Sequence, residues 1–173
     1  MPVTSSLRSQ RLSSLDHDTA HQYVIFRLRL AWFMLPIESI YRVLPLDKHI
    51  PQLTLSGSNV PILDVGKVLF GKVQSANFPQ LTVNGAVVAS KPSLLVVRGQ
   101  SHLTNTEGLV GILSNSQPAL QKITDDQMVP LPPTYSQQWK VDFINLMTLP
   151  SQDRPSLFMI DSDRLISSIL QRK

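Results

Sequence analysis

The sequence predicts a mainly β fold whose short strands close into barrels. Short segments rich in Val, Ile, Leu and aromatic residues alternate with turn signals along most of the chain, as they do in small all-β barrels. Pro36 and Pro45 exclude a long helix in the segment between residues 32 and 45. The pair Asn84-Gly85, flanked by apolar residues, predicts a tight hairpin with positive φ at both positions.

Composition indicates one compact domain, which can have two lobes. A chain of 173 residues with 42% apolar content can bury one core but is too short for several enzyme domains. We expect a polar, flexible N-terminal tail over residues 1–20 and a single domain over residues 21–173.

The same composition predicts a cytoplasmic protein. The absence of cysteine excludes disulfides, thiolate metal sites and cysteine nucleophiles, and it fits a reducing compartment. No apolar run is long enough to cross a bilayer, and residues 1–18 contain no hydrophobic signal segment. We therefore expect no direct insertion into a membrane.

The first predicted strand covers the segment QYVIFRLRL. Its alternation places Phe26, Leu28 and Leu30 on one face, with Arg27 and Arg29 on the other. This is the pattern of a half-buried strand, and it predicts that both arginines are solvated. Further strands are predicted in the segments KPSLLVVRGQ and GLVGILSNS.

Two aspartates each follow an apolar strand and precede a predicted short helix. The segments VPILDVGKVLFG and LFMIDSDRLISSIL align Asp64 with Asp161. A carboxylate at this position accepts the free amide protons of the first helical turn, so both residues are predicted helix caps rather than catalytic acids. Gly71 is predicted to end the first helix, and Arg172 with Lys173 to complement the dipole of the last.

No catalytic, cofactor or metal constellation stands out in the sequence. The histidines lack the spacing of a zinc protease, and neither Gly-Lys pair lies in a phosphate-binding loop. Asp125-Asp126 fits turn chemistry. The net charge of +4 is scattered rather than clustered, and aromatic residues make up only 6%, which disfavours nucleic-acid binding. We expect a non-enzymatic protein without cofactors.

Taken in order, several segments resemble the CheW-like domain family of bacterial chemosensory adaptors, over His21 to Leu170. The segment YVIFRLRLAWFMLPIESIYRVL is similar to the first two strands of that family, and VPILDVGKVLFG to its strand and short helix. SLLVVRGQ, GLVGILSNSQPALQKITDDQMVPLPP and LFMIDSDRLISSIL resemble the later strands, the proline-containing linker and the closing helix.

The resemblance implies two five-stranded SH3-like barrels related by pseudo-two-fold symmetry, with a short helix after Asp64 and a C-terminal helix. It also implies an adaptor that couples chemoreceptors or photoreceptors to a CheA-type histidine kinase, in chemotaxis, phototaxis or type IV pilus motility. One barrel face would pair with the regulatory domain of the kinase, and the groove between the barrels would take a helical hairpin of the receptor. Recruitment to membrane receptor arrays would follow. The alternative is a stand-alone interaction module that regulates another machine outside the array.

The resemblance also implies where partners bind. The apolar candidates are Ile37, Ile40, Val43, Leu55 and Ile62; for each alone, an ordinary core role is the alternative.

Two charged positions depart from the family pattern. The Asn-Leu-Arg-Gly segment of the family falls on residues 54–57, so that Leu55 and Gly57 match while Ser56 replaces the arginine. Arg42 replaces the acid that usually follows the second apolar run. Arg42, Ser56 and Gly57 therefore complete the predicted partner-binding set, and we expect a cognate partner with acidic groups near Arg42.

Overall fold

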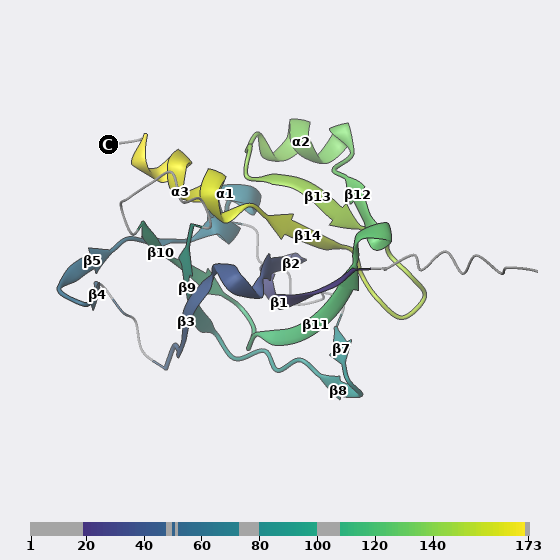
Figure 1. Cartoon of the computed structure of the whole chain (residues 1–173), viewed down its shortest axis with the longest axis horizontal. Coiled ribbons are helices and arrows are strands. Elements are labelled where there is room, and N and C mark those ends of the chain that lie inside the picture. The colour runs from purple at the N-terminus through teal and green to yellow at the C-terminus, as the bar shows by residue number, and fades with distance from the viewer. Residues whose placement is uncertain (1–18, 48–49, 51, 73–79, 100–107, 172–173) are drawn as a thin grey trace, which may run out of the picture.

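The computed structural model describes residues 19–47, 50, 52–72, 80–99 and 108–171, which form short strands, three α-helices and two 3-10 turns. Figure 1 shows the strands at the centre, with the three helices gathered on one side. The predicted tail, residues 1–20, lies almost wholly outside the described residues, and its boundary stays a prediction. The mainly β class is confirmed.

The first lobe is a barrel made from both ends of the chain. Its hydrogen-bonded order is β11-β1-β2-β14-β13-β12. The strands β11 and β12 are joined only by the 3-10 turn η2 (Asp125–Gln127), so they act as one bent strand that supplies both edges of the sheet. The lobe is thus five-stranded, from β1 (Ala20–Leu28), β2 (Ala31–Pro36), β11 (Ala119–Thr124) with β12 (Met128–Pro130), β13 (Ile144–Thr148) and β14 (Leu157–Ile160).

The second lobe is built from the middle of the chain. A four-stranded sheet has the order β3-β9-β10-β6, and β5 runs through Pro61 into β6 while pairing with β4. Counting β5 and β6 as one strand again gives five, from β3 (Ile40–Pro45), β4 (Leu53–Leu55), β5 (Ser58–Val60) with β6 (Ile62–Leu63), β9 (Ser93–Arg98) and β10 (Leu109–Ser114).

The two lobes repeat one pairing pattern. In the first, β11 is antiparallel to β1, β1 to β2, and β14 is parallel to β2. In the second, β3 is antiparallel to β9, β9 to β10, and β6 is parallel to β10. Each parallel strand leads into a helix, α1 (Val65–Phe70) or α3 (Ser162–Leu170). This correspondence is the pseudo-symmetry that the family resemblance implies, and it relates Asp64 to Asp161 as the sequence alignment of the two segments does.

The chain crosses between the lobes after each hairpin. The hairpin β1–β2 belongs to the first lobe, but the chain continues into β3, which pairs with β9 of the second. The hairpin β9–β10 belongs to the second lobe, but β11 returns to pair with β1. Each lobe is therefore completed by strands from the other half of the chain.

Both predicted helix caps are confirmed. The backbone N–H of Lys67 donates to Asp64 Oδ1 over 2.8 Å, and that of Arg164 to Asp161 Oδ1 over 3.0 Å. Gly71 ends α1 with φ +62°, as predicted. The predicted charge complement at the end of α3, Arg172 with Lys173, lies outside the described residues.

The predicted Asn84-Gly85 hairpin is also confirmed. It joins β7 (Thr82–Val83) to β8 (Ala86–Val87), and both turn residues have positive φ, +52° and +80°. The helix α2 (Pro133–Trp139) was not predicted, because its prolines indicate a linker; yet Pro133 stands at the first helical position, where a missing N–H costs nothing.

The prediction that Arg27 and Arg29 are solvated is wrong. Both faces of β1 are buried: Val24, Phe26 and Leu28 pack in one hydrophobic cluster, while Tyr23 and Ile25 pack in another. Arg27 continues the second face and is 7% exposed, with its Nη2 donating to the backbone carbonyl of Asn115 over 3.0 Å.

Arg29 and Leu30 do not continue the strand. They form the turn between β1 and β2, where Arg29 has φ +50°. The alternation therefore predicted a strand correctly. The strand ends at Leu28, two residues before the predicted segment does, and it has no solvent-facing side over Tyr23–Leu28.

Candidate partner-binding groove

A shallow apolar groove lies where the two lobes meet. The interlobe groove, as we call it, has a volume of about 290 Å³ and is lined by Val24, Ile37, Ile40, Val43, Pro118, Ala119 and Leu120. One wall comes from η1 (Ile37–Ser39) and β3, and the other from β1 and the start of β11. Because β3 and β11 are the strands that the lobes exchange, the crossing of the chain itself forms this groove.

A β-bulge in β3 brings two of the lining residues to the same side. Ile40 pairs with Val97 and Arg42 with the adjacent Val96, so Tyr41 is an extra residue in β3. In a regular strand, residues three apart point to opposite faces. The extra residue cancels this alternation, and both Ile40 and Val43 line the groove.

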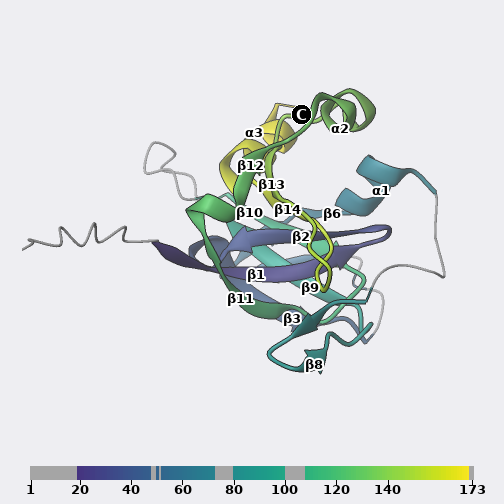
Figure 2. The ribbon, with the colours of Figure 1, turned by 90° about the vertical axis from the view of Figure 1, so that its right-hand side faces the viewer.

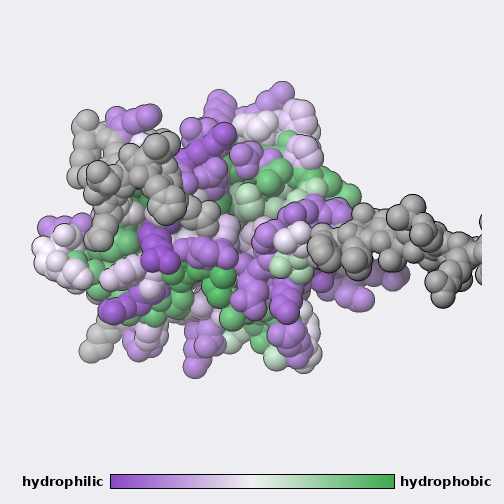
Figure 3. All heavy atoms as spheres, viewed as in Figure 1, coloured by the Kyte–Doolittle hydropathy of each residue, from purple (hydrophilic) through white to green (hydrophobic). Residues whose placement is uncertain are grey.

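The groove exposes large apolar side chains to solvent. Val43 is 39% exposed and Leu120 is 49% exposed, and none of the described residues that line the groove is charged. Figure 3 shows hydrophobic residues gathered between polar ones across the lower part of this view, below the helices. Apolar residues grouped in this way mark surfaces where a partner binds.

The apolar surface continues toward the β7–β8 hairpin. A neighbouring hollow of about 450 Å³ shares Pro118, Ala119 and Leu120 with the groove and is lined on its far side by residues 83–84 and 86–89, of which Val87 is 56% exposed. The start of β11 therefore forms a ridge between two apolar hollows.

The structure divides the predicted partner-binding residues. Ile37, Ile40 and Val43 converge in the interlobe groove. Arg42 is exposed on the same strand but does not line the groove.

The remaining predicted residues lie outside the groove. Ser56 and Gly57 are exposed at the turn between β4 and β5, with φ +50° and +79°, and Leu55 precedes them, half-buried. Ile62 is half-buried and pairs with Gly111 in the second lobe. Figure 1 shows the β4–β5 hairpin projecting at one end of the molecule.

Four groove residues were missed by sequence reasoning, namely Val24, Pro118, Ala119 and Leu120. The available signal was the alternation in ALQKIT, which leaves Leu120 and Lys122 on the exposed side of β11. Nothing local to that segment shows that it lies beside Ile40 and Val43, since the contact depends on the strand exchange.

Tyr23, next to the groove residue Val24 in β1, has a pKa that its surroundings shift. Burial, assisted by the charges of Asp125 and Glu38, raises the pKa of Tyr23 above its usual value of 10.0. Within the described ranges there is no group of three or more His, Cys, Asp or Glu residues placed to hold a metal ion. Nor does any helix in that part of the chain have the length and hydrophobicity to span a bilayer.

These features define a two-barrel, CheW-like fold with an apolar groove between the barrels. The solved structure of the scaffolding protein TtCheW from Thermoanaerobacter tengcongensis is similar to this chain, with a TM-score of 0.55 over 82% of this chain and 84% of that one. The two sequences are 14% identical over the match, so the likeness shows the fold. No family model matches the sequence, and no curated protein does.

Proposed function

We propose that this protein is a non-enzymatic adaptor that couples receptors to a CheA-type histidine kinase in a bacterial chemosensory pathway. The observation that carries the proposal is the convergence of Ile37, Ile40 and Val43 in an exposed groove between two barrels of CheW-like fold. The output, whether chemotaxis, phototaxis or type IV pilus motility, belongs to the same proposal, as does a cytoplasmic location at receptor arrays.

In this proposal the interlobe groove takes the helical hairpin of the receptor. A helix that lies in an apolar groove places side chains at positions i, i+3 and i+4 against it. The groove offers branched and aliphatic side chains of similar size, and its uncharged walls let an apolar helix face dock without burying an unpaired charge. The exposed Val43 and Leu120 then become buried, which supplies the driving force.

The second surface of the adaptor is the β4–β5 turn with Leu55, Ser56 and Gly57, and it would face the kinase regulatory domain. Two surfaces on separate parts of the molecule are what an adaptor requires, because both partners must bind together. Neither surface needs a catalytic group.

The test compares substitutions at two valines whose side chains are almost equally exposed. Val43→Glu places a carboxylate in the groove, whereas Val68→Glu places one on α1 outside it; the two valines are 39% and 38% exposed. We expect Val43→Glu to weaken hairpin binding by roughly tenfold to a hundredfold, because the carboxylate is desolvated without a partner. Val68→Glu should bind like the wild type, as measured by isothermal titration calorimetry.

Unchanged hairpin binding by a folded Val43→Glu variant would exclude the groove as the receptor site. An equal loss in Val68→Glu would show that the effect is not local.

A stand-alone interaction module is the alternative, favoured by the loss of the family arginine at Ser56. Binding to the two array partners distinguishes the two functions. A module outside the array would bind neither a receptor hairpin nor a CheA-type regulatory domain at concentrations up to about 1 mM. A dissociation constant of that size corresponds to a binding free energy of only about 4 kcal/mol.

A further inference from the structure

A second cavity lies on the helical side of the molecule. It has a volume of about 260 Å³, and none of its lining residues lines the interlobe groove. Figure 2 shows α1 and α2 on the upper side of the molecule and β3 with the β7–β8 hairpin on the lower side. This aromatic cavity, as we call it, is lined by Leu30, Ala31, Trp32, Phe70, Tyr135, Gln138, Trp139, Pro155, Ser156 and Phe158.

Five of the ten residues that line the cavity are aromatic. Both tryptophans of the chain, Trp32 and Trp139, line it. Trp139 meets Phe70 at 5.8 Å and Phe158 at 4.9 Å between ring centroids, with interplanar angles of 84° and 77°. Edge-to-face contacts of this kind are the favoured geometry for aromatic pairs and stabilise the packing of these rings against one another.

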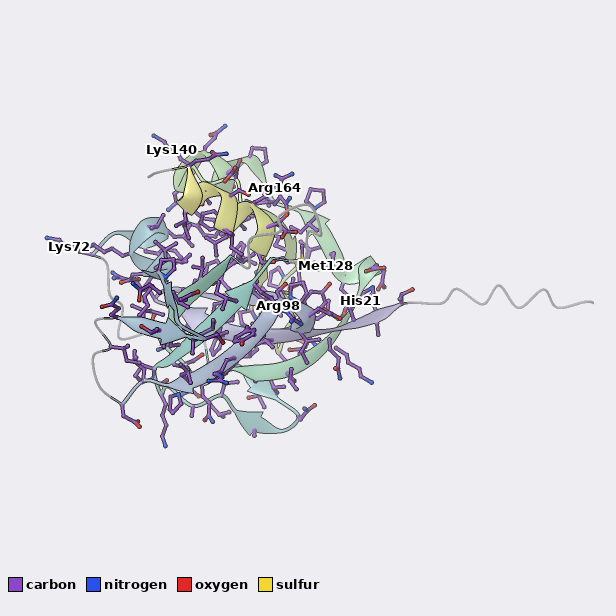
Figure 4. The ribbon with its side chains drawn as sticks, turned by 60° about the vertical axis from the view of Figure 1, so that its left-hand side comes forward. His21, Lys72, Arg98, Met128, Lys140 and Arg164 are labelled. Carbon is purple, nitrogen blue, oxygen red and sulfur yellow. The ribbon has the colours of Figure 1, made fainter. Side chains whose placement is uncertain are left out.

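The chemistry of the wall specifies an uncharged ligand. Among the described residues that line the cavity none is acidic or basic, and the polar groups are the amide of Gln138, the hydroxyls of Tyr135 and Ser156, and the indole N–H groups of the two tryptophans. Figure 4 shows the nearby Lys72, which follows α1, and Lys140, which ends α2, pointing outward from the molecule. A charged ligand would lose its hydration here without gaining an ion pair.

The volume sets the size of the ligand. An apolar cavity of roughly 150 Å³ is enough to hold benzene. The larger volume here accommodates a second fused ring, and flat rings stack well against Trp, Tyr and Phe side chains.

The two lobes share the wall of this cavity. Phe70 is the last residue of α1, which follows the second lobe, while Trp32 and Phe158 belong to β2 and β14 of the first. Gly71, next to Phe70, accepts a hydrogen bond from Arg29 in the β1–β2 turn. The position of one wall thus depends on a contact between the lobes.

We propose that the aromatic cavity is a binding site for a small, uncharged, bicyclic aromatic molecule with one hydrogen-bonding group. The ring system stacks against the half-buried rings of Phe70 and Tyr135, while Trp32, Trp139 and Phe158, which are 2%, 6% and 4% exposed, form the buried part of the wall. The polar group contacts Gln138 or Ser156. Because both lobes form the wall, the bound molecule stabilises the arrangement of the barrels.

The test titrates the full-length protein with 2-naphthol and follows the two indole N–H signals by 1H–15N NMR. Both signals come from cavity residues, so binding at this site moves them in a saturable way. The matched ligand 2-naphthoate has the same rings but carries a charge, and we expect it to bind at least about tenfold more weakly. Equal binding of the two ligands would overturn the assignment of an uncharged ligand.

Four variants locate the site. Ser156→Leu fills part of the cavity and should abolish the titration, whereas Ser167→Leu, on the exposed side of α3, should leave it unchanged. Gln138→Ala changes an exposed side chain and therefore keeps the fold, and it should weaken 2-naphthol binding by roughly threefold to tenfold. No saturable shift in the wild type, or full binding by a folded Ser156→Leu variant, would overturn the proposal. Binding of 2-naphthol by Val43→Glu should match the wild type, since the two sites share no residue.

Discussion

Arg29 Nη2 lies 3.1 Å from Asp64 Oδ2, and this ion pair joins the first hairpin turn of one lobe to the helix cap of the other. The same guanidinium donates through Nη1 to the carbonyl of Gly71, so one side chain contacts both ends of α1. The backbone N–H of Arg29 donates to Asn115 Oδ1 over 2.7 Å. This bond holds the β1–β2 turn against the segment that leads from β10 back to β11. The side chain of Arg29 is only 12% exposed, and the pair is therefore better shielded from solvent than an ordinary surface ion pair.

Arg29→Ala is expected to loosen α1 while leaving α3 intact. The helix has only six residues, too few to be stable without tertiary contacts. We expect the amide of Val68, which donates to the carbonyl of Asp64, to exchange roughly tenfold faster in native-state hydrogen exchange. The amide of Leu165, which makes the same bond in α3, is the internal control. Equal acceleration at both amides would mean that the whole fold is destabilised and that the contact is not specific to α1.

Removal of the two helix caps should have unequal effects. Asp161→Ala should lower the free energy of unfolding by about 1 kcal/mol, the usual cost of a lost cap. Asp64→Ala should cost about 2 kcal/mol, because it also leaves the shielded guanidinium of Arg29 without its carboxylate. Urea denaturation measures both. Lys67→Ala is the matched control, since Lys67 contributes only its backbone N–H to the cap, and a similar loss in that variant would argue against capping as the cause.

Stability should fall in alkaline solution through Tyr23. Burial first, and then the charges of Asp125 and Glu38, raise the pKa of this phenol above 10.0 in the folded state. The folded protein therefore holds the proton more tightly than the unfolded chain does. The resulting stabilisation is complete below pH 10 and is lost as the pH rises from 10 through the higher folded pKa. Thermal melts at several pH values should show a smaller alkaline loss for Tyr23→Phe than for the wild type. Identical alkaline slopes would rule out Tyr23 as the source.

Partner choice should depend on Arg42 and Ser56. Both residues are exposed, and charges on a binding surface control the encounter rate and the rejection of wrong partners. We expect Arg42→Glu to weaken binding to the regulatory domain of the cognate kinase by roughly threefold to tenfold at low salt, with a smaller effect at high salt. The double variant Arg42→Glu with Ser56→Arg should gain affinity for the regulatory domain of a standard CheA-type kinase. If the wild type already binds that standard domain as tightly as the double variant, these two positions do not set specificity.

The fold could be predicted at positions where interactions between neighbouring residues determine the backbone conformation. Asp64 and Asp161 act within one helical turn, and Asn84-Gly85 within one hairpin, so each could be identified from a few neighbouring residues. Of the seven residues that line the interlobe groove, three were predicted. Ile37, Ile40 and Val43 lie close together in sequence, whereas Leu120 joins them from a strand far along the chain.

Arg27 shows why the rest could not be predicted. Alternation in a single segment indicates which residues share a face, but it does not show that a second hydrophobic cluster covers the other face. The bulge at Tyr41 has the same origin, because an extra residue is visible only against the register of the neighbouring strand. Both features depend on strands that the two halves of the chain supply to each other.

The crossing of the chain between the lobes also bears on how such a protein can originate. Each half supplies a hairpin to one barrel and the remaining strands, with their helix, to the other. A shorter chain carrying a single half could not close a barrel alone, but two copies could close two barrels by exchanging hairpins, as in a domain-swapped dimer. The present molecule has the connectivity of such a dimer after duplication and fusion of its gene. Arg29 and Asp64 both lie in the first half, so their ion pair would have formed within one copy, between the hairpin that the copy supplies to one barrel and the helix cap that it supplies to the other.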